Sequence, residues 1–333
     1  MSASSATARR RLAVMGAALP VVVAASLLLG RYPEPGFMPI SRMVEDPLAL
    51  RLVLELRLPR TIAAILLGAA LATSGVVMQM LFANPLVEPG LVGVAQGAAL
   101  GAAVTIVLTD GGAWAIQTGA AVGALVGLTA AYQIARRLRF GGWILRLVLS
   151  GIAVSALLSA GVGLVKFVAD PLEQLPTITF WMLGGLWNVS WDVLVRVLPV
   201  GGGAILILFL GRWRLNVLSL QDRVSFSLGA SPTRERLVLL VSATVAVAAV
   251  ISIAGIIGWV GLIVPHAARR LFGADAGVAL PASALLGIIF VVPADAFART
   301  VTAGEIPLGI VTSLVGATAF ILLMMTNNIR IER

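Results

Sequence analysis

Long apolar runs recur along the whole chain, separated by short segments that carry arginine, proline or glycine. About 20 apolar residues in a helix are enough to cross the roughly 30 Å hydrocarbon core of a bilayer. The pattern therefore predicts an all-α polytopic membrane protein in which residues 1–333 form a single transmembrane domain of about ten helices. The predicted spans are 12–30, 61–82, 91–109, 113–135, 143–168, 193–211, 236–255, 256–270, 278–298 and 307–326.

Two of these spans need comment. The eighth, 256–270, is short enough to be a half-span or a re-entrant segment. The first follows Arg9, Arg10 and Arg11, as the apolar region of a signal peptide would. No small-residue cleavage site follows it, and the polar segment 31–35 ends the run, so we expect a retained first span.

The basic residues predict the orientation. Ten crossings place both termini on one side of the membrane, and cytoplasmic loops carry an excess of Lys and Arg. Of the 24 basic residues, 16 lie in the termini and the loops on their side, and 8 lie in the opposite loops. We therefore expect cytoplasmic termini in a bacterial inner membrane, with lipid as a partner.

The composition supports this class and excludes others. Hydrophobic residues make up 59% of the chain and charged residues 12%, with a mean hydropathy of +1.02, which excludes an ordinary soluble domain. The net charge of +9 does not indicate nucleic-acid binding, because the arginines gather between apolar runs instead of on one basic face. The absence of cysteine excludes disulfides and thiolate metal sites.

Glycines repeat at a spacing of four in two predicted spans, which places them on one face of each helix and predicts close helix packing. The glycines are Gly93, Gly97, Gly101, Gly119, Gly123 and Gly127. An offset of 180 residues also relates Gly75 to Gly255 and Pro85 to Pro265. This offset is compatible with an inverted repeat, which many transporters contain, and equally with chance in a chain of 35 glycines.

Residues with chemical potential are few. The single lysine, Lys166, is not part of a P-loop, and His266 is the single histidine, without other ligands at metal-binding spacing. Acidic residues are nearly absent from the spans, with Asp295 near a span end as the exception. We therefore expect no catalytic residue, no metal and no cofactor on this chain, and an energy source outside it.

The longest predicted cytoplasmic connection is 212–236. Its apolar positions would line one side of short helices ended by Gly229 and Pro232. The segment fits a docking platform for a cytoplasmic partner, or a helix lying on the membrane surface.

Three long strings resemble one protein family. They are RLPRTIAAILLGAALATSGVVMQMLFANPLVEPGLVGVAQGAALGA from Arg57, GWVGLIVPHAARRLFGADAGVALPASALLGIIFVVPADAFARTV from Gly258, and EIPLGIVTSLVGATAFILLM from Glu305. They are similar to the permeases that import ferric siderophores, haem and cobalamin, the FecCD-like or cobalamin-permease family of type II ABC importers. The resemblance implies a homodimer, two cytoplasmic ATPase subunits that hold ATP and Mg, and a periplasmic or lipid-anchored binding protein.

The same resemblance implies roles for individual residues. Arg57, Arg60 and Arg299 would receive acidic residues of the binding protein at the outer face, which suits guanidinium groups. From the sequence alone, Arg57 and Arg60 fit equally well as interfacial anchors of a span.

The resemblance also implies a cytoplasmic gate and a coupling site. Asn84 and Leu86 match the gate, although their segment is also a proline-bounded turn. Ile144 and Leu145 match a second gate that is polar in some relatives and apolar here, which fits closure by dewetting. The residues that match the coupling helices, which sit in a cleft of the ATPase, are Ser227, Leu228, Gly229 and Pro232.

The sequence thus predicts a permease subunit of an ATP-binding-cassette importer, not an enzyme, that transports a ferric siderophore, haem or cobalamin-like compound. The alternatives are a secondary carrier or channel that works alone, and, further off, a structural membrane protein. The lack of carboxylates at mid-membrane disfavours a carrier. Nothing in the residues separates the three substrates.

Overall fold

Each of the ten predicted spans has a helix at its place in the computed structural model, which describes residues 2–109 and 112–325. Eight helices of the described chain are long and apolar enough to cross a membrane. The other two, α5 and α12, have 15 and 13 residues. The ten helices are α1 (Ser2–Leu28), α4 (Leu58–Leu81), α5 (Val94–Leu108), α6 (Ala113–Arg137), α7 (Trp143–Val168), α9 (Trp191–Leu218), α11 (Pro232–Ala254), α12 (Val260–Phe272), α13 (Ala276–Ala298) and α14 (Leu308–Met325).

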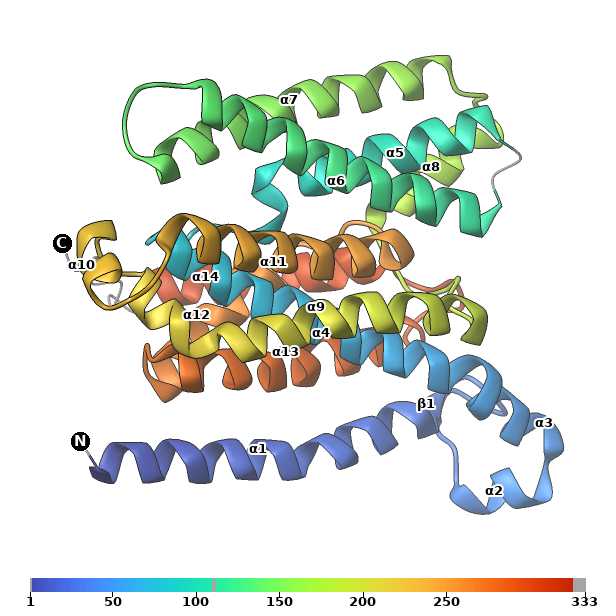
Figure 1. The fold of residues 1–333 in the computed structure, drawn as a ribbon. Coiled ribbons are helices and arrows are strands. Elements are labelled where there is room, and N and C mark those ends of the chain that lie inside the picture. The colour runs from blue at the N-terminus through green and yellow to red at the C-terminus, as the bar shows by residue number, and fades with distance from the viewer. Residues whose placement is uncertain (1, 110–111, 326–333) are drawn as a thin grey trace.

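Short elements connect these helices. They are the two-stranded hairpin β1 (Leu29–Gly30) and β2 (Gly36–Phe37), the helices α2 (Ile40–Glu45), α3 (Pro47–Arg51), α8 (Gln174–Leu183) and α10 (Asp222–Ser227), the π-helix η1 (Leu52–Arg57), and the 3-10 helix η2 (Pro89–Val92). The end of the bundle where α1 begins and α10 lies is the terminal face, and the end with the hairpin, α2 and α3 is the distal face (Figure 1).

The second span is longer than predicted. Asp46 accepts a hydrogen bond from the Leu48 amide at 2.9 Å, and Pro47 occupies the first turn, so α3 begins there. The chain then continues through η1 into α4, which gives one helical segment from Pro47 to Leu81. The charged residues near its start hide this continuity in the sequence.

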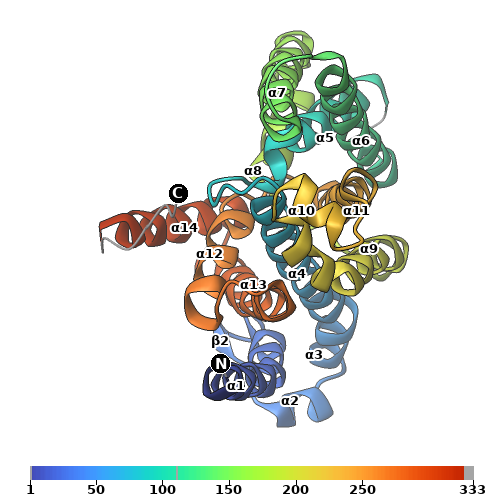
Figure 2. The same cartoon turned by 60° about the vertical axis from the view of Figure 1, so that its left-hand side comes forward.

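Helices α4 and α11 form the centre of the bundle (Figure 2). Within the most apolar stretch of each, 83% and 78% of residues are buried, against 6% for α1. Small residues such as Ala63, Ala64 and Ala243 allow this close packing. Helix α1 lies at the edge and packs mainly on α13.

The glycine-based packing is confirmed. A methyl group on Gly97 would collide with the Gly123 carbonyl, and one on Gly101 with the Gly119 carbonyl. Helices α5 and α6 therefore approach at backbone distance, as the sequence pattern predicts.

The 180-residue offset does not relate equivalent positions, because Gly75 lies inside α4 whereas Gly255 follows the end of α11. The helix order does repeat. Helices α4 to α7 run long, short, long, long, and so do α11 to α14. Moreover, α4 packs on α12 and α13, while α11 packs on α5 and α6. The first helix of each half, α4 in the half α4–α7 and α11 in the half α11–α14, thus packs on helices of the other half.

Candidate functional site

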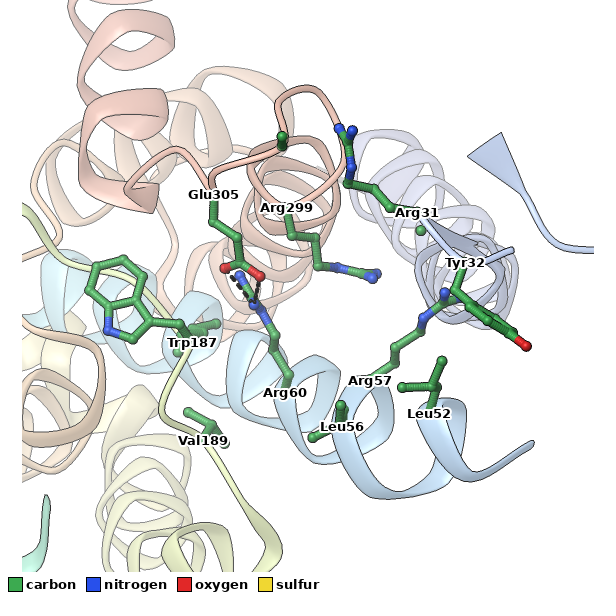
Figure 3. A pocket seen from close by; sticks show the side chains of 13 residues that line it. Arg31, Tyr32, Leu52, Leu56, Arg57, Arg60, Trp187, Val189, Arg299 and Glu305 are labelled. Atoms are coloured by element: carbon green, nitrogen blue, oxygen red, sulfur yellow. Dashed lines mark hydrogen bonds and ion pairs between the residues drawn. The ribbon is translucent and has the colours of Figure 1, made fainter. Parts of the chain in front are cut away.

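The three arginines predicted to dock a partner lie together at the distal face (Figure 3). Arg57 ends η1, Arg60 lies in the first turn of α4, and Arg299 follows α13. They line one pocket of about 390 Å³ with Glu305 and Tyr32. Helix packing of α4 on α13 therefore gathers residues more than 200 positions apart in the sequence.

Two acidic residues hold Arg60 in this pocket. Asp295, which is only 1% exposed, accepts from the Nε and Nη2 of Arg60 at 3.0 and 2.9 Å. Glu305 accepts from Nη1 through both carboxylate oxygens, at 2.9 and 2.8 Å. Nearly the whole donor edge of Arg60 is thus occupied, by one buried carboxylate and by one that is 38% exposed.

Arg57 and Arg299 instead join the first helix to the bundle. Arg57 Nη1 donates to the Leu27 carbonyl at 2.9 Å, and Arg299 Nη1 donates to the Leu29 carbonyl at 2.9 Å. Arg299 also forms an ion pair with Asp295 at 3.6 Å. These side chains thereby bind the carbonyl end of α1, where cations are favoured.

Neither carboxylate partner of Arg60 was predicted from the sequence. Asp295 stood out as the exceptional acid near a span end, and an acid in an apolar span needs a cation nearby. No signal identified Glu305, which lies in the connection between α13 and α14. At the rim, the Tyr32 hydroxyl donates to Asp46 at 2.6 Å, and this hydrogen bond lowers the pKa of Asp46.

The predicted gate residues lie at the end of α4. Asn84 Oδ1 accepts from the Leu86 amide at 2.9 Å, and the Asn84 amide donates to the Gln79 carbonyl at 3.1 Å. These bonds fix the turn, and the Leu86 side chain is 54% exposed. The turn thus presents Leu86 outward from a defined backbone.

Ile144 and Leu145, the pair predicted for a second gate, lie at the start of α7 in different environments. Ile144 packs against the core, whereas Leu145 is 49% exposed. Leu145 also lies over Gly141, whose φ is 62°. Leu145 is therefore the member of the pair that faces outward.

A further contact, beside the predicted gate residues Asn84 and Leu86, was not predicted. Glu88 accepts from the Trp259 amide at 3.0 Å, at the start of α12, and burial raises the pKa of Glu88. Trp259 has a φ of 71°, and its indole lies against Gly316 of α14. The turn after α4 is thereby joined to α12, and through Trp259 to α14.

The predicted coupling residues surround α10 at the terminal face. Leu228 is 58% exposed, Gly229 has a φ of 77°, and Pro232 begins α11. The Ser227 hydroxyl donates to the Arg223 carbonyl at 2.8 Å, within the helix.

Hydrogen bonds to α9 and α11 anchor this short helix. Ser225 donates to the Val217 carbonyl at 2.7 Å, and Arg236 contacts Asp222 at 2.6 Å and the Leu218 carbonyl at 2.7 Å. Phe226 remains 73% exposed. Helix α10 therefore presents an apolar outer surface from a fixed position.

Comparisons with known proteins agree with this architecture. The family model of the FecCD transport family matches residues 18–326. The chain is 44% identical over 274 residues to a Helicobacter pylori protein named as an iron chelatin transport system permease protein. This match covers 82% of this chain and 82% of the relative. It is 34% identical over 317 residues to the molybdate import system permease protein MolB of Haemophilus influenzae, covering 92% of this chain and 93% of that protein.

A solved structure shares the fold. It is an ABC transporter assigned to the metal-chelate type in an inward-facing conformation, with a TM-score of 0.86 and 32% identity, covering 96% of this chain and 99% of that one. The match over nearly the whole length, together with the helix order, is decisive for the family. The chain is a multi-pass membrane protein of the FecCD transport family, a permease subunit of an ABC importer.

Proposed function

We propose that this chain forms, as a homodimer with two ATPase subunits, the membrane passage of an importer for a ferric siderophore or similar metal chelate. The observation that carries this is the family match over residues 18–326 together with 44% identity to a permease named for iron chelatin. Haem and cobalamin are the next substrates to test, and molybdate follows from the second relative.

The proposed orientation puts the terminal face in the cytoplasm. Arg10, Arg137 and Arg223 are exposed there, as expected for loops on the positive side. Helix α10 would then meet the ATPase, and the distal pocket would face the binding protein. Residues 1–333 would act as one permease domain in the inner membrane.

In this proposal, docking exchanges one carboxylate for another on Arg60. Asp295 is too deeply buried to leave, but Glu305 is partly exposed and holds Nη1. A carboxylate of the binding protein would replace Glu305 and free the connection that precedes α14. The exchange gives docking a direct effect on the position of that connection.

Docking is tested with the binding protein that co-purifies with the native complex. Glu305→Gln is expected to tighten its binding, because Gln competes more weakly for Arg60 than a carboxylate does. Arg60→Glu is expected to abolish binding and its dependence on salt. If the native chain, Glu305→Gln and Arg60→Glu bind the binding protein with equal affinity at low salt, the pocket has no role in docking.

Transport is tested in liposomes and in cells. Liposomes that contain the chain with its ATPase are expected to take up radioactive ferric siderophore only when ATP is supplied. Deletion of the gene is expected to abolish growth on that siderophore as the iron source. Uptake by the chain alone, without ATP, would favour the secondary carrier instead.

A further inference from the structure

A groove separates the start of α1 from the end of α12 at the terminal face. It has a volume of about 580 Å³. Helix α1 packs mainly on α13, so its first turns stand beside α12 without close packing. The residues that line the groove are Arg10, Arg11, Val14, Met15, Leu271 and Phe272.

The groove combines an apolar floor with a cationic rim. Val14, in the apolar run of the first span, is 64% exposed, and Leu271, near the end of α12, is 50% exposed. Arg10 and Arg11 are exposed at the start of that run, which is the level of lipid headgroups. Arg11 donates to the Leu271 carbonyl at 3.2 Å, and this bond holds its guanidinium across the groove.

The rim has no negative charge of its own. In the described part of the chain, neither Arg10 nor Arg11 forms an ion pair, and no acidic residue lines the groove. The adjacent Arg270 is also exposed. A ligand that fits must therefore be anionic at one end and apolar at the other.

We propose that the groove is a binding site for an anionic phospholipid. The phosphate would bind Arg10 and Arg11, and one acyl chain would lie along Val14, Met15 and Leu271. Basic pockets between membrane helices recognise lipids in this way. The bound lipid would fill the gap between α1 and α12 and hold the first helix against the bundle.

A second groove provides an internal comparison. It lies between α1 and α13 near the distal face, has a volume of about 460 Å³, and includes Val22, Phe297 and Val301. Among the residues that the structure describes, no basic residue lines this second groove. It is expected to accept acyl chains without regard to headgroup charge.

The site is tested by native mass spectrometry of the full chain with phosphatidylglycerol or phosphatidylcholine. The chain is expected to retain phosphatidylglycerol preferentially. The double variant Arg10→Gln, Arg11→Gln is expected to lose that preference, with affinity falling roughly thirtyfold as two surface cations are removed. The matched control is Arg137→Gln, Arg139→Gln, which alters exposed arginines away from the groove and is expected to leave retention unchanged.

A second measurement locates the lipid. The chain has no native cysteine, so a fluorophore can be attached at Leu271→Cys or at Phe297→Cys. At position 271, brominated phosphatidylglycerol is expected to quench the fluorophore more than brominated phosphatidylcholine does. At position 297, the two brominated lipids are expected to quench it equally. Equal quenching at both sites, equal losses in both double variants, or full displacement by glycerol phosphate would overturn the proposal.

Discussion

At the residue scale, Asp295 organises the distal pocket. Its carboxylate lies between Arg60 and Arg299, and it is the buried member of an ion-pair network that joins α4 to α13. Removing one partner of a buried pair leaves the other charge uncompensated, which is far more costly than losing an exposed pair. The stability and the shape of this pocket therefore depend on one side chain.

Asp295→Ala is expected to lower the free energy of unfolding by on the order of 3 kcal/mol, because Arg60 and Arg299 lose their shared counterion. Thermal unfolding in detergent measures this change. Glu55→Ala is the control, since the Arg51–Glu55 pair is exposed and such pairs contribute about 1 kcal/mol at most. Similar melting temperatures for the two variants would show that Asp295 is not required for the fold.

The pairing of residues across the bundle was beyond prediction from sequence. Arg60 and Asp295 are 235 positions apart, and their contact depends on how α4 packs on α13. Hydropathy reports only the environment of each segment, so it locates spans but not their neighbours. The family resemblance grouped the three arginines as docking residues at the outer face, without revealing that they share a pocket or that their donors are already engaged.

At the element scale, apolar length and small-residue spacing predicted the helices well. A helix lies at each of the ten predicted spans, eight of them in the described chain are long enough to cross a membrane, and the glycine faces of α5 and α6 are present as expected. Helix α8 was missed, because its ten residues begin near Pro171 and contain Pro176, which favour a loop. Its end is instead held by tertiary contacts, including the Gly185 amide donating to the Ala254 carbonyl at 2.7 Å.

Gly97→Leu is expected to destabilise the protein by about 1–3 kcal/mol, since the added side chain must push α5 from α6. The control is Gly163→Leu in α7, where an added methyl group meets nothing within 4 Å. Thermal unfolding of both variants in detergent gives the comparison. If Gly97→Leu melts at the temperature of the control, backbone contact between these helices is not important.

Helix α10 carries the prediction about energy coupling. Leu228→Glu is expected to release the ATPase subunits, because a charge would replace an exposed apolar side chain directly after α10. Phe140→Glu is the control, as it changes an equally exposed apolar residue in another loop at the terminal face. Complexes purified through a tag on the chain report the ATPase content. Full stoichiometry and full hydrolysis in Leu228→Glu would exclude this helix as the coupling element.

At the scale of the whole molecule, the two halves exchange helices around a common centre. Because α4 packs on the second half and α11 on the first, neither half forms a complete bundle alone. The turn with the predicted gate residues Asn84 and Leu86 follows α4 directly, so its position is determined by both halves. In a two-fold dimer, each such turn is presented twice around one axis.

Leu86→Cys is expected to crosslink between the two subunits when the passage is closed at the terminal face, and to lose the crosslink when it opens. The turn is held by Asn84 and Glu88, so the cysteine occupies a defined place. Leu220→Cys, which is exposed beside α10, is the control and is expected not to crosslink at short range. An intact dimer that never crosslinks at position 86, in any nucleotide state, would exclude this gate.

The long helical segment from Pro47 to Leu81 can be compared in length with the thickness of the membrane. Its 35 residues extend about 50 Å at roughly 1.5 Å each, well beyond a hydrocarbon core of about 30 Å. If Leu81 marks one boundary, the backbone positions of Arg60 and Arg57 lie just past the other, while their side chains are largely buried in the bundle. Residues 47–56, the first ten of this segment, then extend beyond the hydrocarbon core, beside the pocket. A bilayer only a few ångströms thicker would place both arginines inside the hydrocarbon core, which would make the proposed docking at this pocket sensitive to membrane thickness.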